Sequence, residues 1–485
     1  MAQFPLPRIF RLNPRTSQRR STPDRGARRY RPRVEPLEDR MLPSTFVVTS
    51  HNDSGPGSLR TAILNVNADP SLSLDVIDFN IPPTAPPFIN IVSPLPVITH
   101  QVFVDGSSQP GFISSPIVDL KGPALPLPIG LAIRATGAVT PFVGAIKALK
   151  IDNFVTGISI QDAGSSTPAN MLLINNSIMA APGGNAVLFL AGTADTTAQI
   201  VSNSITTVGM GRGIAVLTAG TTDKFTFAGN TITASGGGDG ILTQGTAASA
   251  SLTYKGNKLS VQTGGQGIAL NTSPNTTAAA FVSNMITTVG GGHGVAISTT
   301  GQSAVLNFVG NTVHASGGGD AVKVSGNAMV NDLTVTSVNQ LFAKNGADAL
   351  HVTLSPLSKT TVRVVNNLLN TSSLGTGLLL QGGPMFQALV QGNDCNNNRV
   401  GVAVFGNGVT AGNVDLGGGS LGSTGGNNFK SFVSATPTSY AIGLFHVASG
   451  YSMHAMLNLF SVSPLLVIAD GSHDPGALGS GAILT

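Results

Sequence analysis

The stretch Phe281-Val-Ser-Asn-Met-Ile-Thr-Thr-Val-Gly290 nearly repeats Ile200-Val-Ser-Asn-Ser-Ile-Thr-Thr-Val-Gly209, which lies 81 residues earlier. The asparagine inside these stretches recurs every 27 residues between positions 170 and 325. A period of roughly 20–50 residues is typical of supersecondary units that stack on copies of themselves. The recurrent asparagines are Asn176, Asn203, Asn230, Asn257, Asn284 and Asn311.

Apolar residues recur at fixed distances from each asparagine: three before it, and two, eleven and thirteen after it. The last two positions differ by two, which is the strand period. Glycine-rich segments such as Gly236-Gly-Gly-Asp-Gly240 separate the expected strands, because glycine turns a chain at little steric cost. We therefore predict coils of about three strands that stack with the ~4.8 Å spacing of neighbouring strands. The columns are Ile200, Phe227, Tyr254, Phe281 and Phe308; Ile205, Ile232, Leu259, Ile286 and Val313; Ile214, Ile241, Ile268, Val295 and Val322; and Val216, Thr243, Leu270, Ile297 and Val324.

Each recurrent asparagine suits two structural roles. Its amide can bond to the amides of the coils above and below, which would form an inward or turn-facing ladder. Alternatively, it occupies a turn because asparagine tolerates left-handed backbone. Less regular coils are expected to continue the series, with Asn153 before it, Asn339, Asn366 and Asn393 after it, and an end near Asn427.

The composition favours one elongated folded domain. The chain has 485 residues, of which 60 are glycine and 10% are charged, but its 41% of hydrophobic residues at regular spacing argues against disorder. Cys395 is the only cysteine, so no intrachain disulfide is possible. No run of 18 apolar residues occurs, and the sequence therefore predicts no transmembrane helix.

The positive charge is concentrated in the first 40 residues. This segment carries 11 arginines and 4 acidic residues, which leaves 15 basic and 18 acidic residues for the rest of the chain. Prolines interrupt the basic segment and it has no helical periodicity, so we do not expect it to bind nucleic acid. No apolar stretch follows the arginines, as an ordinary signal peptide would require.

Three motifs resemble those of known bacterial surface proteins. The segment Arg31-Pro-Arg-Val-Glu-Pro-Leu-Glu-Asp-Arg-Met-Leu-Pro-Ser44 resembles an LEPR/LEDR-like N-terminal address of planctomycete-type surface and secreted proteins, although Met41-Leu42-Pro43 departs from it. Asp53-Ser-Gly-Pro-Gly-Ser-Leu-Arg-Thr-Ala-Ile63 and Val104-Asp-Gly-Ser-Ser-Gln-Pro-Gly111 resemble segments of right-handed parallel β-helix proteins with the pectin-lyase-like fold. The resemblance implies an all-β, right-handed parallel β-helix solenoid, exported by a non-standard N-terminal signal to the cell surface or the medium.

The sequence divides into four expected parts. Residues 1–45 are expected to be a disordered, Arg/Pro-rich targeting segment. Residues 46–145 form an N-terminal cap with irregular first coils, 146–430 form the regular repeats, and 431–485 form a C-terminal cap and tail. A short helix from Ser58 to Asn67 is expected in the first cap, capped by Ser58, with Leu59, Ile63 and Leu64 on one face.

One polar column is the strongest candidate for chemistry. It lies nine residues after the asparagines, and stacked coils would place its members in a vertical row about 5 Å apart. Such a row could bind a glycan or act as acid and base, or it could be a solvent-facing turn position. Asp239 and Asp320 are three coils apart, about 14 Å, which is too far for a paired-carboxylate mechanism. The column contains Arg212, Asp239, Gln266, His293, Asp320 and Asp348.

Within this column we consider Asp239, His293 and Asp320 as catalytic candidates, and Arg212, Gln266 and Asp348 as binding candidates. Gly292-His-Gly-Val-Ala-Ile-Ser298 resembles a motif of polygalacturonases, but the acidic pairs of that family are missing. Gly236-Gly-Gly-Asp-Gly240 resembles calcium-binding nonapeptide repeats, yet it occurs once per coil. The histidines, His351 among them, show no metal-ligand spacing. The sequence thus predicts no metal site and no cofactor.

The favoured function is a non-catalytic extracellular or cell-surface β-helix, structural or adhesive, with polysaccharide or other cell-envelope components as partners. The alternative is a polysaccharide lyase or glycoside hydrolase of the pectin-lyase-like fold. It would require a charged cluster on adjacent coils, for which His293, Asp320, Lys323 and Asp348 are the best residues. A self-associating envelope component is a third interpretation, because the sequence leaves the oligomeric state open.

Overall fold

The computed structural model describes residues 43–83, 87–136, 141–162, 168–372, 374–406, 413–430, 439–445, 447 and 451–460, and the backbone of 468–469 and 483–484. The chain divides into two units, Met1–Met41 and Leu42–Thr485, and only the second is described here. Most of the expected targeting segment, including all but the last two residues of its address motif, and most of the expected C-terminal tail therefore lie outside the described residues.

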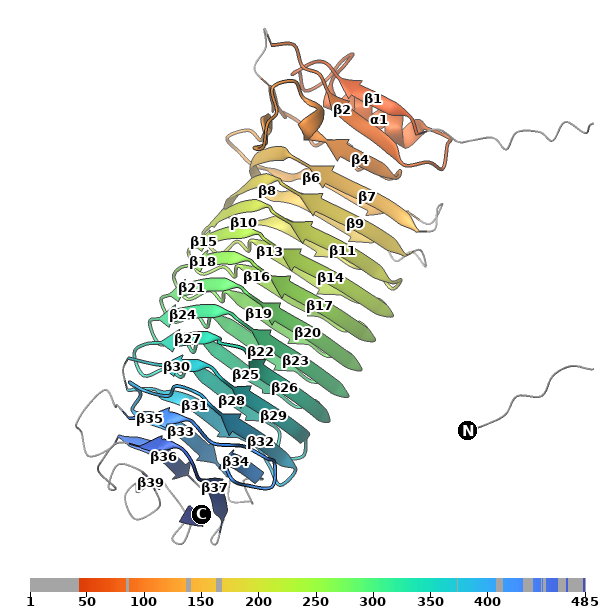
Figure 1. Ribbon diagram of the computed structural model, residues 1–485. Coiled ribbons are helices and arrows are strands. Elements are labelled where there is room, and N and C mark those ends of the chain that lie inside the picture. Colours follow the sequence, from red (N-terminus) through yellow and green to blue (C-terminus); the bar gives the residue numbers. More distant parts are fainter. Residues whose placement is uncertain are drawn as a thin grey trace, which may run out of the picture. The chain divides into compact units, whose positions relative to one another are not determined.

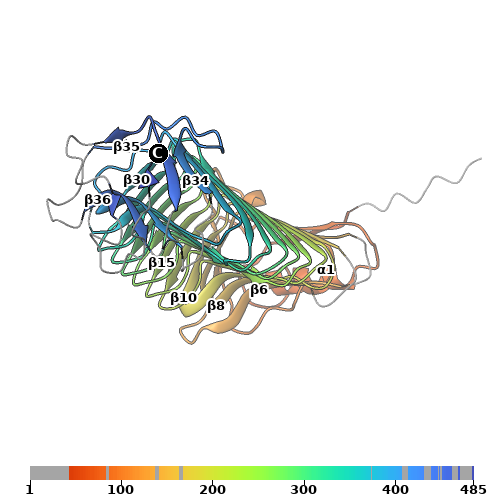
Figure 2. The same ribbon diagram turned by 90° about the horizontal axis from the view of Figure 1, so that it is seen from below.

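The described chain is a parallel β-solenoid in which successive coils stack strand on strand (Figure 1). Seen from below, the coils largely superpose, as a repeat of constant length requires (Figure 2). Each regular coil contributes one strand to each of three faces. The first face comprises β1 (Thr45–Val48), β2 (Asp75–Phe79), β4 (Val102–Asp105), β7 (Phe142–Lys147), β9 (Ala169–Ile174), β11 (Thr196–Val201), β14 (Thr222–Ala228), β17 (Ser249–Lys255), β20 (Thr276–Val282), β23 (Ser303–Val309), β26 (Val330–Thr336), β29 (Lys359–Val365), β32 (Phe386–Gln391), β34 (Asn413–Gly417), β37 (Ser452–Ala455) and β40 (Ile483–Leu484).

The second and third faces are joined through two long strands, β8 (Leu149–Asp162) and β10 (Ser177–Leu190), which run along both. The second face comprises β3 (Phe88–Asn90), β5 (Val118–Lys121), β12 (Ser204–Val208), β15 (Thr231–Ser235), β18 (Lys258–Val261), β21 (Met285–Val289), β24 (Thr312–Ser316), β27 (Gln340–Ala343), β30 (Leu368–Asn370), β35 (Asn428–Phe429) and β38 (Leu459–Phe460). The third face comprises β6 (Leu127–Ala135), β13 (Ile214–Thr218), β16 (Ile241–Gly245), β19 (Ile268–Thr272), β22 (Val295–Thr299), β25 (Val322–Gly326), β28 (Leu350–Leu354), β31 (Thr376–Gln381), β33 (Val400–Phe405), β36 (Tyr440–Phe445) and β39 (Ile468–Ala469).

The register of the sheets follows the sequence period. Phe227 pairs with Tyr254 and Tyr254 with Phe281, so residues 27 apart lie directly above one another. Their rings stack with centroids 4.9 and 4.8 Å apart, and the ring of Phe308 continues the stack at 4.4 Å. All four apolar columns are buried, which confirms the predicted coil with an inward-facing side on every strand.

The recurrent asparagines form a buried amide ladder at the corner between the first and second faces. In each rung, the side-chain Nδ2 donates to Oδ1 of the next asparagine, as from Asn203 to Asn230 at 3.0 Å. The same Oδ1 accepts the backbone N–H of the preceding asparagine, and Nδ2 also donates to a carbonyl of the preceding coil. The ladder runs through Asn176, Asn203, Asn230, Asn257, Asn284, Asn311, Asn339, Asn367, Asn393, Asn427 and Asn458.

Two asparagines that the sequence predicts for this ladder, Asn366 and Asn153, lie outside it. Asn366 precedes the ladder residue Asn367 and has a left-handed backbone with φ of 56°, because the coil is one residue longer than 27. Asn153 also has a positive φ, of 64°, and its side chain donates to the carbonyl of Pro123. The ladder position of that coil is Leu149, whose N–H donates to Asn176.

A helix belongs to the N-terminal end of the solenoid, where β1 would otherwise leave an open core. The helix α1 (Leu59–Ala68) begins at Ser58, whose hydroxyl accepts the N–H of Thr61 as an N-cap. Its buried face contains Leu59, Ala62, Ile63 and Val66. The prediction that Leu64 lies on this buried face is wrong, because Leu64 is 51% exposed.

Strands continue after residue 430, where the sequence repeat is lost. Tyr440–Phe445 pairs with β33 in parallel, and β37 and β38 extend the other two faces. None of the helices in the described ranges has the length and apolar character needed to cross a bilayer.

Candidate functional site

The polar column predicted from the sequence forms a second ladder, at the corner between the second and third faces. Its side chains accept the backbone N–H of the next coil: Asp239 accepts that of Gln266, Gln266 that of His293, and His293 Nδ1 that of Asp320. Asp320 and Asp348 continue the pattern by accepting the N–H groups of Asp348 and Thr376 at 2.9 Å each. Asn185 begins it by accepting the N–H of Arg212.

Arg212 interrupts this second ladder because a guanidinium has no acceptor atom. Its side chain is 45% exposed, and its Nε lies 3.6 Å from the carboxylate of Asp239. Among the described residues, Asp239 forms an ion pair with Arg212 and with none of the histidines, and Gln266 is uncharged. The structure thus separates the column into an Arg212–Asp239 pair and a group of titratable residues beginning at His293.

That group gathers around His351, which lies on β28 and projects beside Asp348. His351 Nδ1 lies 3.1 Å from Asp348 Oδ2 and 3.3 Å from Asp320 Oδ2. Its Nε2 lies 2.8 Å from the hydroxyl of Thr353. Lys323 is the register partner of His351 on the neighbouring strand β25. We name the set His293, Asp320, Lys323, Asp348 and His351 the third-face cluster.

The two histidines of the cluster differ in protonation. Burial lowers the pKa of His293, and the charge of Asp320 only partly offsets this effect. His293 is therefore neutral with its proton on Nε2, and its 3.5 Å approach to Asp320 is not an ion pair. Burial also opposes protonation of His351, but hydrogen bonds and charges from Asp320 and Asp348 outweigh it and raise the pKa to about 9.

The carboxylate of Asp320 is correspondingly held in its ionised form. Burial tends to raise the pKa of Asp320, yet the hydrogen bonds from His351 and from the Asp348 N–H lower it below the ordinary value. Each oxygen of Asp320 and Asp348 has a partner: Oδ1 accepts a backbone N–H and Oδ2 faces the His351 imidazolium. The cluster is thus a satisfied ion-pair arrangement at neutral pH.

The structure places His351 in this cluster, although sequence spacing alone did not assign it. Donor atoms of Asp320, Asp348 and His351 lie within 4.8 Å of one another, and carboxylate and imidazole are suitable ligands for divalent cations. A ligating imidazole must be neutral at the coordinating nitrogen, and Nδ1 of His351 carries a proton up to about pH 9. A cation bound by this donor set would therefore have to displace the Nδ1 proton of His351. The sequence signal was the Asp348-x-x-His351 spacing, one coil after Asp320.

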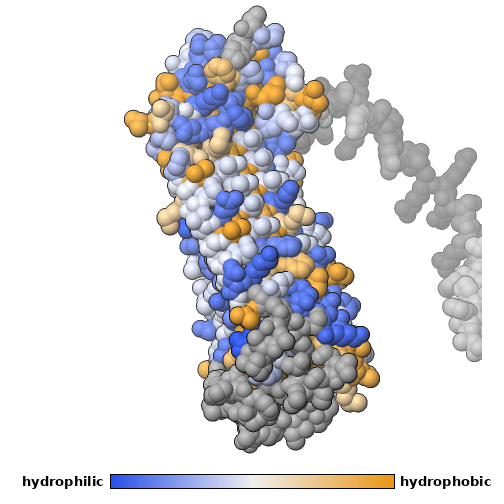
Figure 3. All heavy atoms as spheres, turned by 90° about the vertical axis from the view of Figure 1, so that its left-hand side faces the viewer, coloured by the Kyte–Doolittle hydropathy of each residue, from blue (hydrophilic) through white to orange (hydrophobic). Residues whose placement is uncertain are grey.

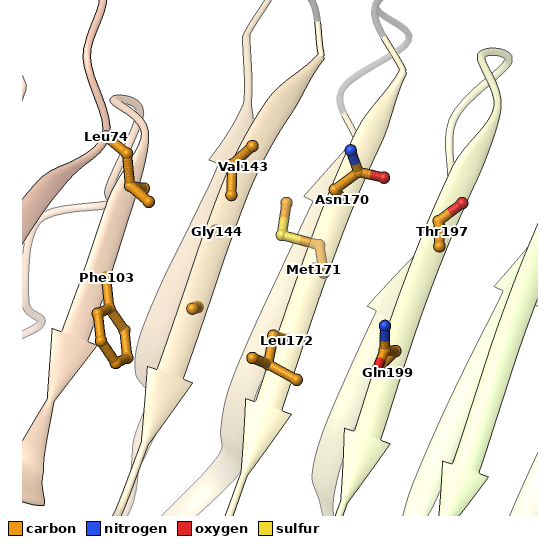
Figure 4. A pocket seen from close by; sticks show the side chains of 10 residues that line it. Leu74, Phe103, Val143, Gly144, Asn170, Met171, Leu172, Thr197 and Gln199 are labelled. Atoms are coloured by element: carbon orange, nitrogen blue, oxygen red, sulfur yellow. The ribbon is translucent and has the colours of Figure 1, made fainter.

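A separate hollow lies on the outer surface of the first face (Figure 4). It has a volume of about 370 Å³ and spans the strands from β4 to β11. Phe103 and Leu172 line the hollow (Figure 4), and the strand register places Ala145 between them. Asn170, Thr197 and Gln199 supply its polar groups. None of its ten lining residues is titratable, so this hollow offers contact area but no acid–base chemistry.

Sequence comparisons show no match to a family model and no match to a curated protein. Among solved structures, the chain is similar to the A-module of the mannuronan C-5 epimerase AlgE6 from Azotobacter vinelandii. The two share 11% sequence identity with a TM-score of 0.47, over 91% of this chain and 99% of that chain.

Proposed function

We propose that this chain is a non-catalytic extracellular or cell-surface β-helix with a structural or adhesive role. The observation that carries the proposal is the second ladder. The side chains most suited to chemistry, Asp239, His293, Asp320 and Asp348, all use an acceptor atom to bind a backbone N–H of the next coil. Their primary role is to hold the corner of the solenoid together.

A general base must have a free lone pair within reach of the proton that it removes. Each carboxylate oxygen of Asp320 and Asp348 already has a partner, and the Nδ1 lone pair of His293 accepts the N–H of Asp320. The hydrogen bonds to Asp320 hold its pKa below the ordinary value against the effect of burial, which makes this carboxylate a weak base. Nε2–H of His293 and the ammonium of Lys323 are available in this cluster as hydrogen-bond donors. A surface of this kind suits binding rather than proton abstraction.

The proposal is tested by incubating the purified full-length chain with acidic and neutral polysaccharides. New reducing ends would report hydrolysis, and ultraviolet absorbance of unsaturated uronates would report elimination. We expect neither signal on any substrate. A product would reject the non-catalytic assignment, and the loss of that product in Asp320→Asn would place the chemistry in the third-face cluster.

The alternative function, a polysaccharide lyase or glycoside hydrolase, is supported by the same cluster. It contains more than three charged or titratable residues on adjacent coils, and Lys323 makes no ion pair or hydrogen bond within the described ranges. If the chain is such an enzyme, Lys323→Ala should abolish turnover and leave the melting temperature nearly unchanged. Lys359→Ala, which removes an exposed lysine of the first face, is the matched control.

The surface location is proposed from the address-like segment Arg31–Ser44 and from the nearly neutral body that follows it. Expressing the full-length chain in a bacterium that carries proteins with this address, followed by fractionation, tests it. We expect the chain in the envelope or the medium, and replacement of Glu38-Asp39-Arg40 by alanines should retain it inside the cell. Finding the unaltered chain in the cytoplasm would reject the location.

A further inference from the structure

The outer surface of the first face carries exposed charges of both signs in the middle coils. Lys224, Asp332 and Lys359 are exposed on β14, β26 and β29, and within the described ranges none of them makes an ion pair or a side-chain hydrogen bond. Asp195, which directly precedes β11, is also exposed, and its carboxylate accepts the N–H of Thr222 at 2.8 Å. The described strands of the other two faces from β12 to β31 contain no aspartate or glutamate. Over these described strands, the first face alone therefore combines both signs.

Lys224 and Asp332 lie in one outward column of this face. Because the register repeats at every coil, the members of a column lie directly above one another with a spacing of ~4.8 Å. Lys224 is two coils before Ala278 and Asp332 is two coils after it. The two charges are thus about 19 Å apart, and they cannot contact each other within one chain. The column reads Thr197, Lys224, Ser251, Ala278, Val305, Asp332 and Thr361.

Asp195 and Lys359 lie in the neighbouring outward column. Asp195 belongs to it because the pairing of β11 with β14 places this residue one coil before Thr222. Asp195 is three coils before Thr276, and Lys359 is three coils after it. Thr276 and Ala278 both belong to β20, so two columns independently have opposite charges at equal distances on either side of the same strand. This second column reads Asp195, Thr222, Ser249, Thr276, Ser303, Val330 and Lys359.

This arrangement of charges is complementary to a second copy of itself. A two-fold axis that lies in the interface along β20 reverses the order of the coils and keeps each column opposite the same column of the other chain. The axis would place Lys224 opposite Asp332 of the second copy, and Asp195 opposite Lys359 of the second copy. By symmetry, each of these ion pairs would form twice. Opposite charges at matched positions fix the register of an interface and disfavour other partners.

The size and shape of this surface suit a stable dimer. Seven strands from β11 to β29 at ~4.8 Å, each with about seven residues at ~3.3 Å, make a surface of about 34 Å by 23 Å, close to the ~800 Å² per partner of a standard interface. At its centre Ala278 is exposed and Ala280 is half-buried, and their short side chains let two sheets approach to the ~10 Å spacing of packed sheets. Val305 and Val330 add apolar area, with exposures of 38% and 45%.

The other two outward columns are compatible with the same axis. It would place Gln199 opposite Arg363 of the second copy, where the amide oxygen can accept a hydrogen bond from the guanidinium. It would also bring Val201 and Val365 of the two chains into apolar contact. Among the described strand residues from β11 to β29, the remaining outward cation is Lys255. It lies in the column beside the asparagine ladder, where its long side chain can reach solvent at the edge of the interface.

We propose that two copies of this chain associate through their first faces, with their coils running in opposite directions about a two-fold axis along β20. The ion pairs Lys224–Asp332 and Asp195–Lys359 between the two chains set the register, and the alanines of β20 allow close approach. The third-face cluster lies on another face and is not covered by this interface. The association goes beyond the structural or adhesive role proposed above and does not depend on it.

Other arrangements of two copies leave these charges unpaired. A two-fold axis parallel to the solenoid would set each coil opposite itself, and the strands of Lys224 and Asp332 each have a single outward charge. The second face lies on the side of the molecule shown in Figure 3, where surface of intermediate hydropathy predominates in the middle coils. Its described strands from β12 to β30 contain Lys258 but no carboxylate, so a second copy bound there would gain no ion pair.

The test measures the mass of the full-length chain in solution by analytical ultracentrifugation over a range of concentrations. Lys224→Asp and Asp332→Lys each place like charges opposite one another in the proposed dimer. An equimolar mixture of the two variants restores both contacts, because every reversed residue then meets an opposite charge on the other chain. Lys258→Asp, which reverses an exposed charge of the second face, is the matched control. Circular dichroism verifies that each variant is folded.

We expect the unaltered chain and the control to reach twice the 49.1 kDa mass of one chain. Each reversal acts at two symmetric contacts and should raise the dissociation constant on the order of a hundredfold, because like charges placed across an interface repel. The equimolar mixture should return to the mass of the dimer. Added salt should weaken the dimer of the unaltered chain, since it screens the ion pairs.

Four outcomes would overturn the inference. The unaltered chain could stay monomeric, or its mass could keep growing with concentration, which would indicate open assembly through other surfaces. The dimer could persist in both single reversals, or the mixture could fail to restore a dimer that they dissociate. None of these outcomes changes what is expected in the polysaccharide assay or in the fractionation, which test the proposed function separately.

Discussion

Tyr254 donates a hydrogen bond to Thr243 across the buried interior of the solenoid, with 2.9 Å between the two hydroxyl oxygens. Tyr254 is the one hydroxyl-bearing residue in a column that otherwise contains isoleucine and phenylalanine, and Thr243 is the one in a column of aliphatic residues. Burial raises the pKa of Tyr254 far above its usual range. Tyr254 and Thr243, the two exceptions to the repeat, therefore depend on each other, because each buried hydroxyl is the hydrogen-bond partner of the other.

This pair predicts a non-additive effect on stability. Tyr254→Phe and Thr243→Val should each destabilise by about 1–2 kcal/mol, because each leaves a buried hydroxyl without its partner. The double variant, which restores the residues of neighbouring coils, should unfold close to the unaltered chain. Urea denaturation followed by circular dichroism measures all three. Additive losses in the double variant would mean that the hydrogen bond is not what couples the two sites.

The asparagine ladder predicts a large effect of a small truncation. Asn257→Ala removes an amide that donates to Asn284 and to Phe227 and accepts from Asn230. It leaves buried N–H and C=O groups unpaired, which should destabilise by about 3 kcal/mol or more. Asn271→Ala, on the exposed outer side of β19, should change stability by less than about 0.5 kcal/mol. Comparable losses in the two variants would contradict a structural ladder.

The second ladder is interrupted at Arg212, which has no acceptor atom for the backbone N–H of the next coil, and this interruption predicts a stabilising substitution. Arg212→Asn supplies an acceptor for the N–H of Asp239, as Asn185 does for Arg212 one coil earlier. The lost pairing with Asp239 is largely exposed and contributes little. The variant should therefore gain about 0.5–1 kcal/mol, measured as a higher urea midpoint. Arg212→Ala removes the charge without adding an acceptor, and an equal gain in that variant would show that repulsion or desolvation, rather than the hydrogen bond, is responsible.

The ion pairs of His351 predict a pH dependence of stability. The pKa of His351 rises from 6.5 to about 9 on folding, so its contribution is fully present below pH 6.5 and is lost as the pH rises toward 9. After allowance for the one-fifth exposure of the side chain, the contribution is on the order of 2 kcal/mol. The urea midpoint should fall between pH 6.5 and 9.

His351→Gln should flatten this dependence, because glutamine does not titrate. His314→Gln, which replaces an exposed histidine outside the third-face cluster, should leave the slope unchanged. The comparison of the two variants isolates the cluster from other groups that titrate in the same range. A slope that survives in His351→Gln would place its origin elsewhere in the chain.

The 27-residue period was sufficient to predict the solenoid and its buried columns, because stacked parallel strands repeat the same environment at the same position of every coil. It failed where a coil changes length. Counting 27 from Asn339 gives Asn366, but one extra residue shifts the ladder to Asn367. Both residues are asparagine, and only the hydrogen-bond geometry distinguishes the left-handed position from the ladder position.

The third-face cluster illustrates the same limit for chemistry. The column at nine residues after each asparagine indicated His293, Asp320 and Asp348 as neighbours. It did not include His351, which belongs to a different column and approaches Asp348 within its own coil and Asp320 in the preceding coil. Whether two side chains at a corner of the solenoid come into contact depends on the backbone conformation of the turn between their strands. The sequence period gives the spacing of the coils, but it does not give this conformation.

The amino-acid sequence alone established the coil and its inward columns, because positions that are buried in every coil recur as apolar residues at a constant spacing. The surface location that the first residues suggest stays a prediction. Which polar groups satisfy one another was visible only in the folded chain. The second ladder and the third-face cluster join residues of different coils, and the Tyr254–Thr243 pair joins two faces of one coil. Their distances are set by strand register and turn length together, and a change of one residue in a turn is enough to alter them.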